Sequence, residues 1–193
     1  MGRKAHFNKN EIIDAALNII SREGIKALTM QSLAERIQAP IGSIYHRFPS
    51  RDELLAELWI KITKSFQEGF LAALNNSGQK AALYTLQWVR TNPQEGQLLL
   101  LYRREEFSAG NWPEEFRQKI ADLSRELDDG IRSFTKRTLG RLNRENLQRA
   151  VFALIDVPFA AVSRSLQNGE SPPRQLNNLV RETYTTIIGR KEL

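Results

Sequence analysis

Hydrophobic positions recur with the period of an α-helix along nearly the whole chain, and no stretch shows the alternation typical of a half-buried strand. After Asn8, which is followed three residues later by a glutamate as in a capping box, Ile13, Leu17 and Ile20 are spaced i, i+4, i+7. Gly24 supplies a stop signal. The pattern therefore predicts a first helix over residues 8–24.

Two short helices are predicted to follow. Thr29 can cap the second helix, whose apolar face is made by Met30, Leu33, Ala34 and Ile37. Pro40 suits the first turn of a third helix, because its missing N–H would have no partner there. Three short helices in about 50 residues are typical of a helix-turn-helix domain.

Longer helical patterns fill the rest of the chain. Their predicted ranges are 50–78, about 79–90, 92 to a break at residues 110–111, 113–140, 143–167 with a kink at Pro158, and 176–188. We therefore expect an all-α protein of about nine helices. Residues 1–50 would form an N-terminal three-helix helix-turn-helix domain, and residues 51–193 a C-terminal helical domain.

Composition narrows the function classes. The chain of 193 residues has 41% hydrophobic content, enough for a sizeable core, and contains no cysteine and two histidines. These counts argue against a disulfide framework, a zinc ribbon, a thiol nucleophile and a histidine metal cage. The sequence suggests no cofactor and no metal. Because it has no signal-peptide pattern and no uninterrupted apolar run of about 18 residues, we expect a cytoplasmic protein with no membrane association.

The net charge of +6 is unevenly distributed. Through Arg51 the chain carries 8 Lys and Arg against 4 Asp and Glu, whereas the remainder carries 20 against 18. A basic head on a nearly neutral body indicates binding to a polyanion, although a solvated charged face would give the same count.

The third predicted helix has the residues expected of a DNA reader. Ile44 and Phe48 can pack on the first two helices, which leaves a polar and basic outer face. Gly42 and Ser43 are small enough for close approach to DNA. The next three outward residues, Tyr45, His46 and Arg47, carry donors for phosphates or base edges.

A long motif surrounds this helix. It reads Leu28-Thr29, Leu33-Ala34 and then GSIYHRFPSRDELL from Gly42 to Leu55. The segment of residues 10–58 closely resembles the N-terminal domain of the tetracycline-repressor (TetR) family. The resemblance implies a dimeric regulator in which residues 1–50 are the DNA-binding domain and residues 51–193 are a helical ligand-binding and dimerisation domain that binds an effector.

The resemblance also implies roles for individual residues. Thr29 and Tyr45 would hydrogen-bond phosphates, and Arg51 stands where a phosphate-contacting lysine is usual. Two positions depart from the family pattern: Gln38 replaces the glycine that usually begins the turn, and Ile41 replaces a polar or basic residue. Ile41 either touches a thymine methyl group or only packs.

The complete set of candidate DNA-binding residues extends over the second and third helices and the N-terminal arm. These are Arg3, Lys4, Thr29, Gln31, Ser32, Ile41, Gly42, Ser43, Tyr45, His46, Arg47 and Arg51. For Tyr45 the alternative is a half-buried packing residue, and for His46 a surface histidine without a specific role. The basic N-terminus is either an arm that reaches the DNA or an ordinary charged terminus.

Aromatic residues gather in the middle of the chain. They either form an ordinary core or line a mostly apolar effector cavity. The candidate effector-pocket residues are Trp59, Phe66, Phe70, Trp88, Tyr102, Phe107, Phe116, Asp156 and Phe159. Asp156 lies in an apolar stretch and faces either a cationic effector, an arginine, a partner helix or solvent.

The last two helices have apolar stripes with no remaining element to cover both. Pairing with a second subunit would form a four-helix interface, whereas the alternative is a monomer with these helices folded on its own core. The candidate dimer-interface residues are Leu147, Val151, Leu154, Val162, Leu176, Val180, Tyr184 and Ile187.

The sequence thus predicts a homodimeric transcriptional regulator, a repressor released from palindromic double-stranded operator DNA by a small apolar or amphipathic effector. An effector-independent helix-turn-helix DNA-binding protein is the alternative. An enzyme has little support, because both histidines lie in the proposed DNA head and no phosphate loop is present. A basic amphipathic membrane binder is disfavoured, because the cations accompany turn residues and not a lipid-facing stripe.

Overall fold

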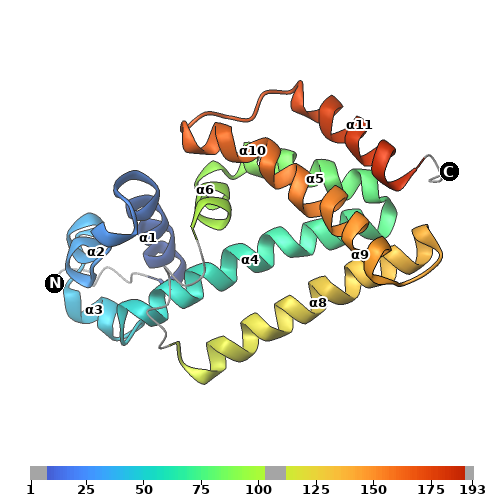
Figure 1. The fold of residues 1–193 in the computed structure, drawn as a ribbon. Helices are drawn as coiled ribbons and strands as arrows, with labels where there is room; N and C mark the ends of the chain where they lie inside the picture. Colours follow the sequence, from blue (N-terminus) through green and yellow to red (C-terminus); the bar gives the residue numbers. More distant parts are fainter. Residues whose placement is uncertain (1–7, 103–111, 190–193) are drawn as a thin grey trace. The chain divides into compact units, whose positions relative to one another are not determined.

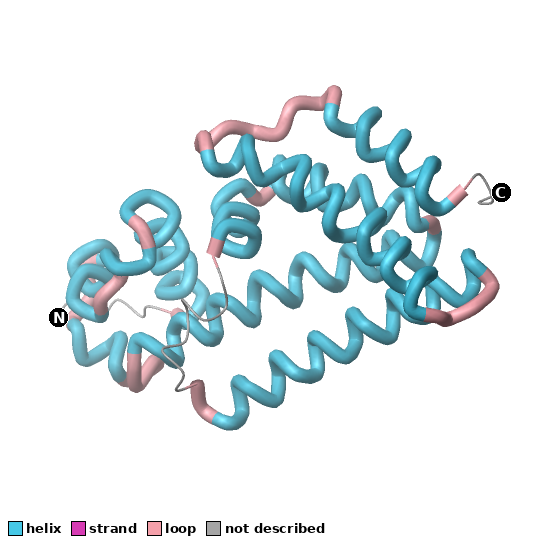
Figure 2. Tube along the Cα trace, in the orientation of Figure 1, coloured by secondary structure: helices cyan, strands magenta, loops and turns pink. Residues whose placement is uncertain are grey.

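The computed structural model describes residues 8–102 and 112–189. All regular elements in these two ranges are helices, which confirms the all-α prediction (Figures 1 and 2). Three of the predicted site residues, Arg3, Lys4 and Phe107, lie outside the described residues.

The chain divides into two compact units. Unit 1 comprises Met1–Ile62 and Tyr102–Lys119, and unit 2 comprises Thr63–Leu101 and Ile120–Leu193. The divisions fall inside two long helices, α4 and α8, so each of these helices contributes residues to both units. The predicted domain boundary at residue 50 stays a prediction.

Unit 1 contains the short helices at the start of the chain. In order these are α1 (Lys9–Glu23), the 3-10 turn η1 (Ile25–Ala27), α2 (Met30–Ile37), α3 (Ile41–Tyr45) and the first turns of α4 (Arg51–Asn76). Helix α1 packs on η1 and α2, and α2 packs on α3. The fully buried Ile12, Ile20, Leu33, Ile44 and Phe48 form the centre of their shared core.

Local capping fixes where these helices begin. The Asn8 side chain accepts from the Glu11 N–H at 2.9 Å, and the Glu11 carboxylate accepts from the Asn8 N–H at 2.9 Å. This confirms the predicted capping box at α1. Gly24 ends the helix with φ of 85°, a left-handed value that favours glycine.

Unit 2 contains the longer helices of the body. With the remainder of α4 these are α5 (Gly78–Thr91), α6 (Pro93–Leu101), α8 (Glu114–Leu139), α9 (Arg144–Val151), η2 (Phe152–Asp156), α10 (Val157–Gln167) and α11 (Leu176–Ile188). Helix α5 lies in the middle of the unit and packs against α6, η2, α10 and α11 (Figure 1).

Buried polar contacts join α4 and α8 within unit 2. Gln67 of α4 is only 4% exposed, and its side-chain N–H donates to the carbonyl of Leu123 in α8 at 2.8 Å. Near the other end of α4, a guanidinium N–H of Arg137 donates to the carbonyl of Leu74 at 3.2 Å. Such bonds satisfy polar groups that burial would otherwise leave unpaired.

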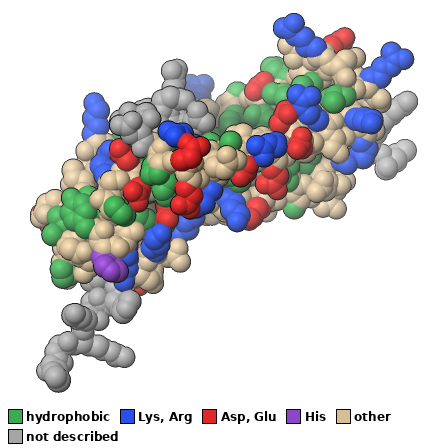
Figure 3. Space-filling model, turned by 90° about the horizontal axis from the view of Figure 1, so that it is seen from below, with side chains coloured by type: hydrophobic (Ala, Val, Ile, Leu, Met, Phe, Trp, Pro, Cys, Tyr) green, Lys and Arg blue, Asp and Glu red, His purple; other side chains and the backbone are tan. Residues whose placement is uncertain are grey.

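The outer face of α8 carries charges that pair along the helix. Arg125 with Asp122 and Arg132 with Asp128 form ion pairs three and four residues apart. Figure 3 shows a face on which acidic and basic side chains are interspersed. Both members of each pair are exposed, so each pair stabilises the helix by only a few tenths of a kcal/mol.

The helical run Arg144–Gln167 joins α9, η2 and α10. By length and composition it is apolar enough to cross a membrane, and 39% of its most apolar window is buried within the described structure. Its central segment η2 is a π-helix, in which the Val157 N–H donates to the Phe152 carbonyl. Pro158 follows directly and has no N–H to donate to Leu154 in an α-helical bond, which explains the irregularity here.

Candidate nucleic-acid interface and apolar groove

The turn between α2 and α3 has the geometry required of a helix-turn-helix although no glycine is present. Gln38 ends α2 in the left-handed conformation, with φ of 53° and ψ of 39°. The N–H of Ala39 then donates to the Ala34 carbonyl at 3.0 Å. Pro40 precedes α3 at its N-cap position, as its fixed φ allows. Gln38 thus adopts the conformation that glycine provides elsewhere, at an energetic cost.

Helix α3 is held from behind by two apolar side chains. Ile44 is 0% exposed and Phe48 1% exposed, and the Phe48 N–H donates to the Ile44 carbonyl at 2.8 Å. On the opposite face, Ile41 is 40% exposed and Tyr45 48% exposed. The buried pair fixes the orientation of α3, so that the exposed pair is presented on a rigid element.

Gly42 lies in this exposed face. Its φ is not in the left-handed region, and no described atom beyond its own neighbours lies within 4 Å of where a Cβ would stand. Glycine in a helix destabilises it by roughly 0.5–1 kcal/mol relative to alanine. Neither backbone conformation nor internal packing therefore requires glycine here, whereas close approach of an external backbone would.

The start of α2 presents the hydroxyl of Thr29. The Thr29 oxygen accepts from the Ser32 N–H at 2.9 Å, and the Ser32 oxygen accepts from the Thr29 N–H at 2.9 Å. Thr29 is exposed and uses its hydroxyl as an acceptor, so its hydrogen can still be donated to a phosphate. The Ser32 hydroxyl donates inward to the Ala27 carbonyl at 2.9 Å and is therefore chiefly a capping group.

Arg51 reaches back from α4 to the segment before α2. Its Nε donates to the Leu28 carbonyl at 2.6 Å and its Nη2 to the Ile25 carbonyl at 2.7 Å. A guanidinium can form such a fork and a lysine cannot. The structure thus gives Arg51 an anchoring function that the sequence did not predict, and its predicted phosphate contact stays a prediction.

The remaining candidates surround these positions. Gln31 is exposed and donates to Glu35 at 2.7 Å, and His46 is exposed at the end of α3. Arg47 is half-buried, and its Nη1 donates to the Ser43 carbonyl at 3.2 Å. All described candidates of α2 and α3 therefore belong to one unit, and the phosphate and base contacts themselves stay predictions.

Further cations of unit 1 brace α1 against its neighbours. Lys9 pairs with Glu57 of α4 at 2.6 Å and lies 5.2 Å from the centre of the Phe48 ring. Lys61 pairs with Asp14 at 2.9 Å. These contacts connect α1 to α4 and to the buried Phe48 that follows α3.

In unit 2 the aromatic candidates converge on Phe66. Its ring centre lies 5.9 Å from Phe70, 5.7 Å from Tyr84, 5.1 Å from Trp88 and 6.1 Å from Phe159. Burial raises the pKa of Tyr84. The rings thus form one cluster contributed by α4, α5 and α10, while the other candidates Trp59, Tyr102 and Phe116 belong to unit 1.

Two threonines lie on the same helices, each three residues before a ring of the cluster, Phe66 in α4 and Trp88 in α5. The hydroxyl oxygens of Thr63 in α4 and Thr85 in α5 are buried, with no hydrogen-bond partner among the described residues. Thr85 is 0% exposed. Such unpaired hydroxyls are uncommon, because each costs about 1–3 kcal/mol.

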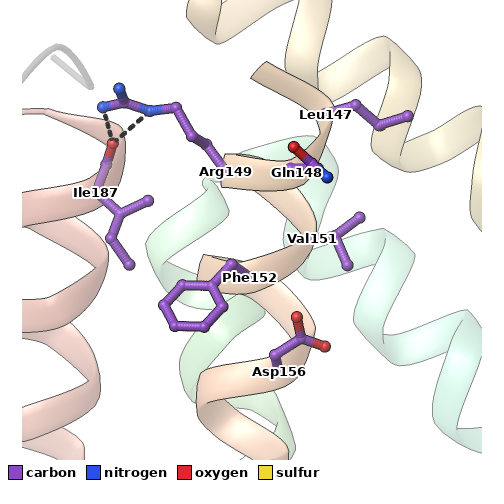
Figure 4. Close-up of a pocket in the computed structure, with 7 residues that line it drawn as sticks. All are labelled: Leu147, Gln148, Arg149, Val151, Phe152, Asp156 and Ile187. Carbon is purple, nitrogen blue, oxygen red and sulfur yellow. Dashed lines mark hydrogen bonds between the residues drawn. The ribbon is translucent and has the colours of Figure 1, made fainter. Parts of the chain in front are cut away.

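A groove of about 570 Å³ lies along α9 and η2 beside α11 (Figure 4). Leu147, Val151 and Ile187 of the predicted dimer interface line it, together with Asp156, Gln148, Arg149 and Phe152. Arg149 closes one side, since its Nε and Nη2 both donate to the Ile187 carbonyl, the former at 3.1 Å. We call this surface the α9–α11 groove.

The other predicted interface residues lie elsewhere. Leu176 is half-buried, whereas Leu154, Val162, Val180 and Tyr184 are buried within the single chain and belong to the core of unit 2. Asp156, predicted for the effector pocket, is exposed in the groove. The assignment of these residues to an interface or a pocket stays a prediction.

The sequence reasoning missed Phe152, which is 50% exposed in the groove, and its neighbour Gln148. The sequence predicts that Pro158 kinks this helix, but the predicted apolar stripe keeps an unchanged period through the segment before the proline. Pro158 was the available signal, because a proline disturbs the turn that precedes it.

Comparison with known proteins agrees with the geometry of unit 1. The family described as "Bacterial regulatory proteins, tetR family" matches residues 12–58. An HTH-type transcriptional regulator of Saccharopolyspora erythraea is 33% identical over 52 residues, which are 27% of this chain and 22% of that protein. The chain thus aligns with less than a quarter of the length of that relative.

Two other proteins match over most of the chain. The nicotine-responsive transcriptional repressor HdnoR of Paenarthrobacter nicotinovorans is 20% identical over 159 residues, covering 77% of this chain and 79% of that protein. The crystal structure of the TetR family transcriptional regulator PfmR from Thermus thermophilus superposes with a TM-score of 0.66 at 17% identity, covering 94% of this chain and 99% of that one. At this identity the superposition shows a shared fold.

Proposed function

We propose that this chain, which belongs to the TetR family of bacterial regulatory proteins, is a homodimeric repressor that binds palindromic operator DNA and is released by a small apolar or amphipathic effector. The exposed face of α3 is the observation that carries the proposal. There Ile41, Gly42 and Tyr45 are presented to solvent while Ile44 and Phe48 are buried behind them.

On this proposal α3 enters the major groove and α2 lies across the phosphate backbone. The Tyr45 hydroxyl and the Thr29 hydroxyl donate to phosphates, and Gly42 lets the backbone of α3 approach the bases. A twofold dimer would present two such readers to half-sites about 34–36 Å apart, or a multiple of that spacing. Residues 1–50 are proposed as the DNA-binding domain, in a protein that acts in the cytoplasm and not as an enzyme.

The proposed effector site is the aromatic cluster around Phe66. Apolar walls suit an apolar or amphipathic molecule, and the unpaired hydroxyls of Thr63 and Thr85 offer hydrogen bonds to its polar group. The relative HdnoR is named as nicotine-responsive, which supports a body that responds to a small molecule. Helix α4 carries Phe66 and is the next helix after α3 in the chain. A displacement of α4 at the aromatic cluster can therefore be transmitted along this one helix to the segment that follows α3.

One observation favours the alternative of an effector-independent DNA-binding protein. Four rings already surround Phe66 at 5.1–6.1 Å, so the cluster is filled by its own side chains. A thermal-shift screen of lipophilic compounds separates the two functions. A stabiliser whose effect is lost in Thr85→Val supports the effector site, and no stabiliser in a broad screen supports the alternative.

Selection of bound sequences from random DNA tests the DNA-binding function. Paired half-sites separated by about one helical turn are expected, and enrichment of single or no sites would contradict a dimeric regulator. In gel shift against the selected site, we expect Tyr45→Ala to bind about 10- to 100-fold more weakly with an unchanged melting temperature. Tyr45→Phe is the matched control that removes only the hydroxyl.

A further inference from the structure

Two polar residues of the α9–α11 groove are placed symmetrically in the sequence about Phe152. Phe152 is 50% exposed at its centre. Gln148 and Asp156 lie four residues before and four residues after it, and both are exposed in the same groove. Figure 4 shows the three side chains on one helical run, with Phe152 between the other two. An amide donor and a carboxylate acceptor are therefore placed at equal sequence distances on either side of an exposed aromatic ring.

Such an arrangement is complementary to itself when the helix is reversed. In an antiparallel pair centred on Phe152, position 148 of one chain faces position 156 of the other, and the same contact is made a second time. A side-chain amide N–H and a carboxylate form a charge-assisted hydrogen bond, which is among the stronger kinds. The two phenylalanine rings would meet at the centre.

We propose that the twofold axis of the homodimer passes beside Phe152, where the run Arg144–Gln167 packs antiparallel on its copy and Gln148 of each chain donates to Asp156 of the other. The inference rests on the homodimer of the proposed function and adds the position of its axis, its helix polarity and the polar contact that fixes the register. The π segment η2 contributes to it, because it carries both Phe152 and Asp156 while Ala153 and Leu154 between them stay buried.

The surface fits a second copy better than a lipid bilayer. The run Arg144–Gln167 is apolar, and 39% of its most apolar window is buried, so the chain itself covers that window only in part. Asp156 lies in the middle of the exposed strip, and an ionised carboxylate is costly inside a membrane. In a dimer the same carboxylate gains a donor.

Cysteine cross-linking tests the position of the axis, and the chain contains no cysteine of its own. A residue beside a twofold axis meets its own copy, and a disulfide requires Cβ atoms about 3.5–4.5 Å apart. We expect Phe152→Cys to form disulfide-linked dimers at least about 10-fold faster under mild oxidation than Leu179→Cys. Leu179 is the matched control, since it is also a large exposed hydrophobic residue, at 57%, but lies on α11 and does not line the groove. Faster linkage of Leu179→Cys would overturn the inference.

Mixed variants test the polarity. Neither Gln148→Cys nor Asp156→Cys is expected to link to itself, whereas an equimolar mixture should give the linked heterodimer. Self-linkage of either variant in place of the mixed product indicates parallel helices and contradicts the proposal. This measurement also keeps the test decisive if loss of the Phe152 ring weakens association.

An exchange of the two polar residues tests the contact. Gln148→Asp would place two carboxylates opposite each other twice, and we expect the dimer dissociation constant to rise roughly 10- to 100-fold. The double variant Gln148→Asp with Asp156→Gln exchanges the roles and should return most of the lost affinity. A double variant as weak as the single variant would exclude the pairing.

Light scattering of the unsubstituted chain tests the homodimer separately from the position of its axis. A monomeric mass at micromolar concentration, or co-flotation with anionic vesicles in place of dimerisation, overturns the homodimer and the inference together. A dimeric mass without linkage of Phe152→Cys overturns only the proposed axis.

Discussion

Large hydrophobic side chains are exposed in both units of the described structure, but the residues beside them differ. Ile41 and Tyr45 of unit 1 lie on the five-residue helix α3, beside Gly42 and His46. Phe152 of unit 2 lies on a long helix, between an amide and a carboxylate.

The difference teaches that an exposed apolar residue does not by itself identify a partner. In unit 1 the first 51 residues carry twice as many cations as anions, so a polyanion fits. In unit 2 the groove places an amide and a carboxylate at equal sequence distances from an exposed ring, so a copy of the same surface fits. The polar neighbours decide the kind of partner, and the apolar residue contributes the buried area.

Among the variants that test this difference between the two surfaces, Phe152→Glu should have the largest effect. Burying a phenylalanine contributes about 1.5–3 kcal/mol, and a twofold interface loses two of them while gaining two charges. We expect the dimer dissociation constant, measured by sedimentation, to rise by at least about 100-fold. Operator affinity should fall with it, because two half-sites are then bound by separate chains.

Tyr45→Ala is the control for that experiment, since it should lose operator affinity and keep the same dimer dissociation constant. A Phe152→Glu protein that remains dimeric at nanomolar concentration would remove the distinction between the two surfaces.

Arg51→Ala is expected to have the next largest effect, on the stability of unit 1. It removes two hydrogen bonds from a charged donor to the carbonyls of Leu28 and Ile25, at 2.6 and 2.7 Å. The half-buried site suggests a loss of about 2 kcal/mol in the free energy of unfolding, measured by urea denaturation.

Arg51→Lys distinguishes anchoring from a phosphate contact. Lysine keeps the charge but cannot form the fork, so an anchoring role predicts lower stability with a nearly unchanged salt dependence of DNA binding. If phosphate contact is the main role, stability stays unchanged in Arg51→Lys, and the salt slope falls by about one in Arg51→Ala only.

The sequence predicted the start of each short helix because the signals there are local. Asn8 with Glu11 and Thr29 with the N–H three residues on are contacts within one turn, and both are present. The reader was predictable for a related reason: Ile44 and Phe48 had to be buried, which left Tyr45 and its neighbours outside.

The α9–α11 groove was not predictable in the same way. The π segment depends on how the backbone before Pro158 is accommodated, and it changes which residues face outward. The anchoring by Arg51 joins residues 23 and 26 positions apart, and no local pattern encodes such a contact. These features depend on tertiary packing.

Gly42→Ala should sharpen the interpretation of α3. Because a Cβ there meets no described atom within 4 Å, the variant should gain about 0.5–1 kcal/mol in stability. Operator affinity should nevertheless fall by about 10-fold, because the added methyl group lies where DNA approaches. Gly78→Ala is the contrasting variant, since its Cβ would overlap the Tyr184 hydroxyl and stand 2.5 Å from the Phe134 ring, and stability should fall. Equal operator affinity in Gly42→Ala would argue against close approach at this position.

Gln38→Gly should have the smallest effect, because it changes only the turn between α2 and α3. A left-handed residue other than glycine costs about 1–2 kcal/mol, and the greater freedom of glycine in the unfolded chain offsets part of the gain. We therefore expect the melting temperature of the protein to rise by a few degrees, corresponding to about 1 kcal/mol or less, with operator affinity unchanged. Gln38→Ala keeps the strain and should give no increase. A rise of equal size in both variants would mean that the side chain of Gln38, and not its backbone conformation, limits the stability of the turn.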